Sequence, residues 1–169
     1  MPASRKETRV RPLSAKEEAA WRALGRAIVV LPRVLEADLL ESHGLTLGEY
    51  GVLMNLSEQP DRCLRMNELA SFVAISVSGL TRVVDRLERQ GLVERVRAED
   101  DGRGQLAVLT GAGLDRLRAA YPDHLESVRR HVMDHLHCVD LVAFAHAIGN
   151  IAAGEPGPAL RPRRAARRT

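Results

Sequence analysis

A change of hydrophobic period at Leu92 constrains the fold of this chain more than any other feature. Before that point, apolar side chains recur at the three- and four-residue spacing of a helix: Leu80, Val83, Val84 and Leu87. Gly91 is the residue type that most often follows the last turn of a helix. The short apolar runs 92–97 and 105–109 then flank a polar segment, as the strands of a β-hairpin do. The sequence therefore predicts a helix over residues 76–91 that leads directly into a hairpin.

Two capping boxes mark helix starts nearer the N-terminus. In each, a hydroxyl residue is followed three positions later by a glutamate: Ser14 with Glu17, and Thr46 with Glu49. The first opens a long amphipathic helix that ends at Gly44. We expect it to kink near residues 28–31, because Pro32 lacks the backbone N–H that the helix needs. The second opens a short helix over residues 47–58, and another short helix begins at Asn67.

Two further helices are expected beyond the hairpin. Apolar residues keep a helical spacing from Leu114 to Leu136, interrupted by Pro122, and a last helix carries apolar residues from Leu141 to Ile151. The arginine- and proline-rich end of the chain has little to bury. The sequence thus predicts three parts: a flexible basic N-terminus over residues 1–13, one domain over residues 14–153, and a disordered basic tail over residues 154–169.

The order of the central elements favours one fold class. Two short helices joined by a tight turn and followed at once by a hairpin are typical of a winged helix-turn-helix, which binds DNA. Aromatic residues make up only 3% of the chain, so Leu, Val, Ile and Ala must form the core, which suits packed helices. We expect a mainly α protein with a small β-hairpin wing between long N- and C-terminal helices.

Net charge alone does not identify a partner. Residues 1–15 carry a net charge of +3 and residues 154–169 carry +4, whereas the whole chain carries +3. Residues 16–153 are therefore at −4 and mildly acidic. A nucleic-acid interface has to be argued from the placement of individual side chains rather than from the basic pI.

The outward face of the predicted helix 76–91 carries such side chains. Small residues at its N-terminal end would let the backbone approach phosphate: Ser76, Ser78, Gly79 and Thr81. Arg82 and Arg86, one turn apart, can each reach a guanine edge or a phosphate, and the sequence does not distinguish the two. Alternatively this segment is a solvated surface of salt bridges, because six arginines between Arg82 and Arg103 are matched by six acidic residues.

The same segment resembles the MarR family. The run from Ser78 to Val93 is similar to the family's recognition helix and the start of its wing. Asp101-Gly102-Arg103 resembles an Asp-x-Arg motif in the wing, and residues 109–113 resemble the Leu-Thr-x-x-Gly motif that follows the wing. The resemblance covers about residues 16–153. It implies a DNA-binding lobe over about residues 46–110 and a homodimer formed by helices at about residues 14–44 and 111–153.

On this resemblance, two recognition helices would enter successive major grooves of a pseudo-palindromic double-stranded DNA site. Arg103 would insert into a flanking minor groove, held in place by Asp101. Many family members release DNA when a small molecule, often aromatic or phenolic, enters a cleft beside the dimerisation helices. Candidate residues for that ligand are Trp21, Arg22, Arg26, Tyr50 and Met54. The favoured alternative is that Trp21 and Tyr50 are simply the large apolar members of their helices.

A metal site has weaker support. On a continuous helix His131, His135 and Cys138 would share one face, which could ligate zinc. The stripe lacks a fourth ligand, for which the first helix offers Glu36, Glu41 or His43. We therefore expect no metal and no cofactor. Cys63 and Cys138 are far apart in sequence, and each is expected to be a packing residue.

No P-loop, Gly-x-Ser-x-Gly or His-Glu-x-x-His motif is present in the sequence, so we expect no enzyme. No apolar run approaches the ~18 residues of a membrane span, so we expect a cytoplasmic protein that does not bind membranes. The sequence predicts a transcriptional regulator, in the first instance a repressor released by a small-molecule effector. The alternatives are a helical protein-interaction module that keeps the winged fold, and a metal-responsive regulator.

Overall fold

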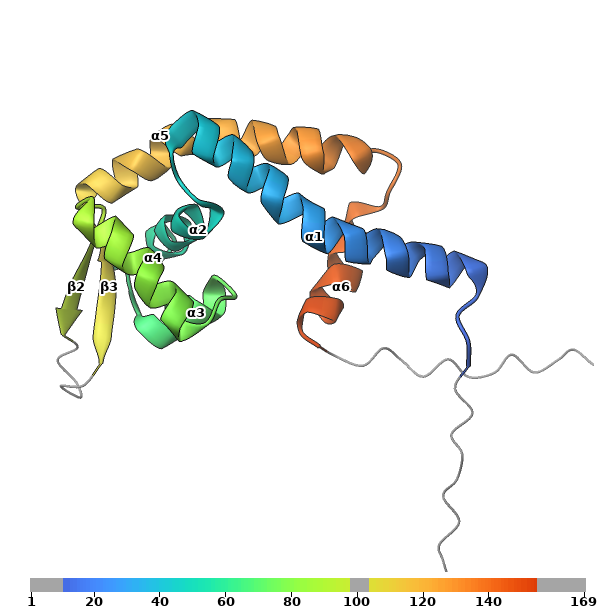
Figure 1. The fold of residues 1–169 in the computed structure, drawn as a ribbon, viewed down its shortest axis with the longest axis horizontal. Coiled ribbons are helices and arrows are strands. Elements are labelled where there is room, and N and C mark those ends of the chain that lie inside the picture. The colour runs from blue at the N-terminus through green and yellow to red at the C-terminus, as the bar shows by residue number, and fades with distance from the viewer. Residues whose placement is uncertain (1–10, 98–103, 155–169) are drawn as a thin grey trace, which may run out of the picture. The chain divides into compact units, whose positions relative to one another are not determined.

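The computed structural model describes residues 11–97 and 104–154, and these form two compact units that divide after His131. Figure 1 shows the elements. The first unit contains α1 (Ala15–His43), α2 (Leu47–Ser57), β1 (Cys63–Arg65), α3 (Met66–Phe72), α4 (Val77–Arg89), β2 (Val93–Arg97), β3 (Gln105–Leu109) and α5 (Gly111–His131). The second contains the 3-10 turn η1 (Met133–His135) and α6 (Leu141–Ala152). The predicted fold class, mainly α with a small sheet, is confirmed. The expected extent of one domain, residues 14–153, stays a prediction.

Helix α1 begins and ends as its sequence predicts. The Glu17 N–H donates to the Ser14 hydroxyl at 3.3 Å, and the Ser14 N–H donates to the Glu17 carboxylate at 2.7 Å. Gly44 follows the last turn with φ +62°, a left-handed conformation that glycine adopts without strain. Pro32 lies inside α1, and the helix continues past it. The kink expected near residues 28–31 stays a prediction.

Helices α2, α3 and α4 surround the core of the first unit. Leucines from all three are fully buried: Leu53, Leu56, Leu69, Leu80 and Leu87. Truncating any one of them to alanine should cost about 2–5 kcal/mol of stability, because the cavity left in a close-packed core is not refilled. The helix predicted at residues 76–91 is α4. Its end is tightly fixed, because Gly91 has φ +69° and the Leu92 N–H donates back to the Leu87 carbonyl at 2.9 Å.

The hairpin has a third strand that the sequence analysis missed. The sheet is antiparallel with the order β1-β3-β2, so the predicted strands β2 and β3 are joined by β1 on the far side of β3. In the central strand Ala107 pairs with Leu64 on one side and Arg95 on the other. Three residues are too few for an alternating pattern to identify β1 from sequence.

A close approach joins the start of α5 to the start of β2. A Cβ placed on Gly113 would lie 2.1 Å from the backbone oxygen of Leu92, so only glycine fits there. The Thr110 hydroxyl donates to the Gly91 carbonyl at 2.8 Å and accepts from the Gly113 N–H at 3.0 Å. The Leu-Thr-x-x-Gly segment therefore fastens the sheet to α5.

Polar contacts hold α5 against α1. Asp38 accepts hydrogen bonds from the buried Ser127 hydroxyl and from Arg130 at 2.8 Å, and its Oδ2 lies 3.1 Å from Nε2 of His131. The Ser127 hydrogen bond, more than the nearby Arg130, lowers the pKa of Asp38. Pro122 lies inside α5. The helix ends at His131, so the expectation of helical spacing as far as Leu136 is wrong over its last turn.

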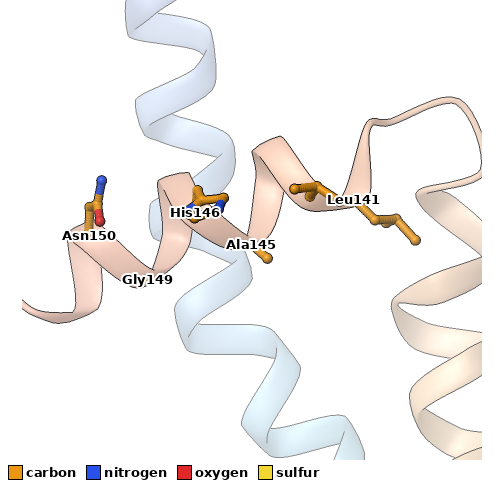
Figure 2. A pocket seen from close by; sticks show the side chains of 6 residues that line it. Leu141, Ala145, His146, Gly149 and Asn150 are labelled. Atoms are coloured by element: carbon orange, nitrogen blue, oxygen red, sulfur yellow. The ribbon is translucent and has the colours of Figure 1, made fainter.

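The second unit presents apolar side chains to solvent. Helix α6 is capped by Asp140, whose carboxylate accepts from the N–H groups of Val142 and Ala143 at 2.9 and 3.1 Å. None of its residues is buried, and Val142 is 70% exposed. A shallow hollow of about 520 Å³ follows the helix (Figure 2), lined by Leu141, Val142, Ala145, His146, Gly149 and Asn150. No helix in residues 11–97 or 104–154 is long and apolar enough to cross a membrane.

Candidate nucleic-acid interface

Small polar residues gather around the first turn of α4. The Ser76 hydroxyl accepts from the Gly79 N–H at 3.1 Å and lies 3.2 Å from the Ser78 hydroxyl. The Thr81 hydroxyl donates to the Val77 carbonyl at 2.9 Å, which leaves its oxygen able to accept another hydrogen bond. A Cβ at Gly79 would lie 3.1 Å from the Ser76 hydroxyl, so a larger residue would crowd the cap. The four small residues predicted from sequence thus form one exposed helix start.

Arg82 lies on the face of α4 that points away from the core. Leu80, Val84 and Leu87 are buried, and helical geometry places Ser78 and Arg82 on the opposite side. Arg82 is exposed, and within the described residues it has no ion pair or hydrogen bond through its side chain. Its guanidinium is therefore free to reach a partner outside the chain.

Arg86 differs from Arg82, although the sequence did not distinguish them. Its Nε donates to Oε1 of Glu49 at 2.9 Å, and the Glu49 residue is only 3% exposed. The other oxygen of Glu49 accepts from the backbone N–H and the hydroxyl of Thr46 at 2.8 and 3.0 Å. Arg86 compensates a buried carboxylate and ties α4 to the start of α2. Arg86 thus makes a structural contact through its Nε, and its DNA contact stays a prediction, because the side chain is 45% exposed.

Arg95 on β2 holds the two acidic side chains of α4. Its guanidinium donates to Asp85, to Glu88 at 3.1 Å and to the Thr81 carbonyl at 3.2 Å, and the side chain is only 19% exposed. The salt bridges expected in the alternative interpretation are therefore real, but they leave Arg82 out. Sequence reasoning missed Arg95 because these contacts need the packing of β2 beside α4.

The tip of the hairpin falls outside the described residues. Arg97 pairs with Gln105 as the last register position of β2 and β3. The predicted wing residues Asp101 and Arg103 lie between them, in the segment 98–103 that the structure does not describe. Their roles stay predictions.

The proposed ligand residues separate into two groups. Tyr50 and Met54 line a cavity of about 340 Å³ between α2 and α5, together with Ser57, Glu58, Leu114, Leu117, Arg118 and Tyr121. Trp21, Arg22 and Arg26 do not line it. Trp21 is 63% exposed on α1, and Arg22 pairs with Glu18 at 2.6 Å. The structure thus brings together only the two candidates from α2.

An aromatic pair, a buried tyrosine and a half-buried histidine, lies beside that cavity. The rings of Tyr50 and His124 are tilted, with centroids 4.3 Å apart. Burial raises the pKa of Tyr50 and lowers the pKa of His124. Nδ1 of His124 is buried and has no hydrogen-bond partner among the described residues. The neutral form of the imidazole is therefore favoured.

The metal stripe does not form on one helix. Helix α5 ends at His131, whereas His135 belongs to η1 and Cys138 follows it. Two of the first-helix candidates have other partners: Glu36 accepts from the Leu47 N–H at 3.2 Å, and His43 lies 2.7 Å from Asp123. In the part of the chain that the structure describes, no three His, Cys, Asp or Glu side chains are placed to hold a metal ion.

Comparison with known proteins connects this geometry to one family. The sequence pattern of the MarR family matches residues 43–104. The crystal structure of AbsC, a MarR family transcriptional regulator from Streptomyces coelicolor, is 39% identical, with a TM-score of 0.78 over 86% of this chain and 97% of that one. Sco3205 from the same organism, solved in complex with DNA, is 36% identical, with a TM-score of 0.79 over 90% of this chain and 96% of that one.

A curated relative is more distant. The HTH-type transcriptional regulator PrsX from Escherichia coli is 27% identical over 95 residues, which span 54% of this chain and only 57% of PrsX. The extent and identity of the match to AbsC, together with the helices and hairpin described above, show that this chain belongs to the MarR family of transcriptional regulators, which are not enzymes.

Proposed function

We propose that the chain is a sequence-specific regulator that binds double-stranded DNA, with α4 in a major groove and the β2-β3 hairpin over the adjacent minor groove. The observation that carries the proposal is the exposed start of α4. Ser78 and Arg82 face away from the core, Arg82 is unpaired within the described residues, and the nearby acidic side chains are held by Arg95. Sco3205, a relative solved in complex with DNA, supports DNA as the partner.

Exposed apolar side chains support a homodimer. On α1, Trp21, Ile28 and Val29 are 63%, 61% and 52% exposed, and α6 has no buried residue. Large apolar surfaces of this kind are typical of protein interfaces. A two-fold dimer would present two copies of α4, so its DNA site would be pseudo-palindromic with half-sites about one helical turn apart.

The cavity between α2 and α5 supports a small-molecule effector. Its volume of about 340 Å³ lies within the range of small-ligand sites. Tyr50 and Tyr121 offer aromatic surface and Arg118 offers a positive charge, which together suit an aromatic or phenolic anion. We infer that the protein is a repressor and that the effector favours a conformer with lower DNA affinity.

The DNA proposal is tested by mutation of Arg82. A duplex selected by the purified protein from a random library serves as probe, and Kd is measured at several salt concentrations. Arg82→Ala should weaken binding by about 1–3 kcal/mol if the guanidinium contacts a base, or chiefly reduce the salt dependence if it contacts phosphate. Arg103→Ala tests the wing in the same way.

The matched control is Arg129→Ala, which removes an exposed arginine from α5 far along the chain from α4. It should leave Kd within about twofold of wild type. A wild-type protein that selects no duplex would refute the proposal and favour the protein-interaction module.

A further inference from the structure

Two carboxylates sit on or beside the face of α4 that is proposed to meet DNA. Helical geometry places Asp85 about two turns beyond Ser78 on the side away from the core, and Glu88 about two turns beyond Thr81. Their side chains are 45% and 41% exposed. A free carboxylate at this position would repel phosphate and oppose the attraction that Arg82 offers.

Arg95 changes this electrostatic surface. Its Nη2 donates to Asp85 and to the Thr81 carbonyl at 3.2 Å, and its Nη1 donates to Glu88 at 3.1 Å. One guanidinium therefore engages both carboxylates from the side of β2. The pairing does not depend on a mobile side chain, because Arg95 pairs in register with the buried Ala107 of the central strand and is mostly buried.

We propose that Arg95 is a positioning residue for DNA binding: it draws Asp85 and Glu88 toward β2 and offsets their charge, so that phosphate can approach the face of α4 on which Arg82 lies. The inference rests on the proposed function. It assigns a role in DNA binding to a side chain that contacts other residues of this chain and not the DNA.

The test uses the full chain and the selected duplex. Arg95→Met keeps the aliphatic stem and removes the charge, so both carboxylates become free. Binding should weaken by about tenfold or more near 50 mM salt, and by less near 200 mM salt because exposed charges are screened. The matched control Arg11→Met removes an arginine that is also paired with a glutamate, Glu17, at the start of α1. It should leave Kd within about twofold of wild type.

A rescue separates charge from structure. Replacing both carboxylates in the Arg95→Met background, as Asp85→Asn and Glu88→Gln, should restore Kd to within about threefold of wild type, because there is no longer a charge to offset. Neutral amides cannot replace the guanidinium as a structural clamp, so a purely structural role predicts no rescue. Circular dichroism establishes that each variant is folded.

A second variant keeps Arg95 and does not depend on the stability of Arg95→Met. Asp85→Asn with Glu88→Gln should bind DNA at least as tightly as wild type. Weaker binding by this variant, wild-type binding by Arg95→Met, or failure of the rescue would each overturn the inference while leaving the proposed function intact. A wild-type protein that binds no duplex would overturn both.

Discussion

Replacing Gly113 with alanine tests the joint between the sheet and α5. The added Cβ would lie 2.1 Å from the Leu92 backbone oxygen and 2.7 Å from a methyl carbon of Leu109. The leucine methyl can move, but the backbone oxygen lies where α4 passes into β2. To relieve this clash, the start of α5 must move away from the oxygen by about 1 Å or more, since ordinary contacts begin near 3.4 Å.

The expected loss of stability is the difference between two effects. Overpacking of this kind costs about 1–3 kcal/mol where side chains can adjust, and more where backbone must shift. Alanine in place of a helical glycine returns about 0.5–1 kcal/mol. We expect Gly113→Ala to lower the free energy of unfolding by about 2 kcal/mol, measured by urea denaturation at constant protein concentration.

Gly111 provides a matched control in the first turn of the same helix. Nothing lies within 4 Å of a Cβ built there, and its φ is not left-handed. Gly111→Ala should therefore be neutral or stabilise the protein by up to about 1 kcal/mol. Equal stabilities of Gly111→Ala and Gly113→Ala would refute the close approach between α5 and Leu92.

Three further changes test other contacts. Ala74 has φ +56°, so Ala74→Gly should stabilise the protein by about 0.5–1 kcal/mol in urea denaturation, and a loss would contradict the left-handed turn. Burial lowers the pKa of His124, so as the pH falls below 6.5 the unfolded chain takes up a proton more readily than the folded one and the free energy of unfolding decreases. His124→Phe should remove this part of the acid sensitivity and keep the packing on Tyr50. Arg86→Met should cost about 2–3 kcal/mol by leaving the buried Glu49 unpaired, and a cost below about 0.5 kcal/mol would show that the pair is not structural.

Local signals in the sequence were sufficient to predict most helix ends. The capping boxes at Ser14 and Thr46 act over three residues, and so does the glycine after α4, which makes them visible without the fold. The end of α5 was missed because its apolar spacing continues to Leu136 after the helical backbone has stopped at His131. Periodicity reports which side chains are apolar, and it does not report where hydrogen bonding ends.

The candidate site was predictable only in part, since pairing depends on tertiary contacts. Spacing along one helix identified Arg82 and Arg86 as equivalent, and nothing in it could show that Glu49, 37 positions before Arg86, is buried against only one of them. Arg95 was likewise counted among balanced charges. The arginines and acidic residues of this segment are indeed equal in number. Whether an arginine is left free to bind a partner depends on which of these side chains form ion pairs in the fold.

The residues around Leu92 explain why α4, the hairpin and α5 should respond together to a perturbation. The Leu92 N–H donates to the last turn of α4, and its carbonyl accepts from the Thr110 N–H at 3.2 Å, directly before α5. The same carbonyl is the oxygen against which Gly113 packs. Since Arg95 adds a second link between β2 and α4, a shift at the start of α5 cannot be absorbed by the hairpin alone and must reach α4 through these short contacts.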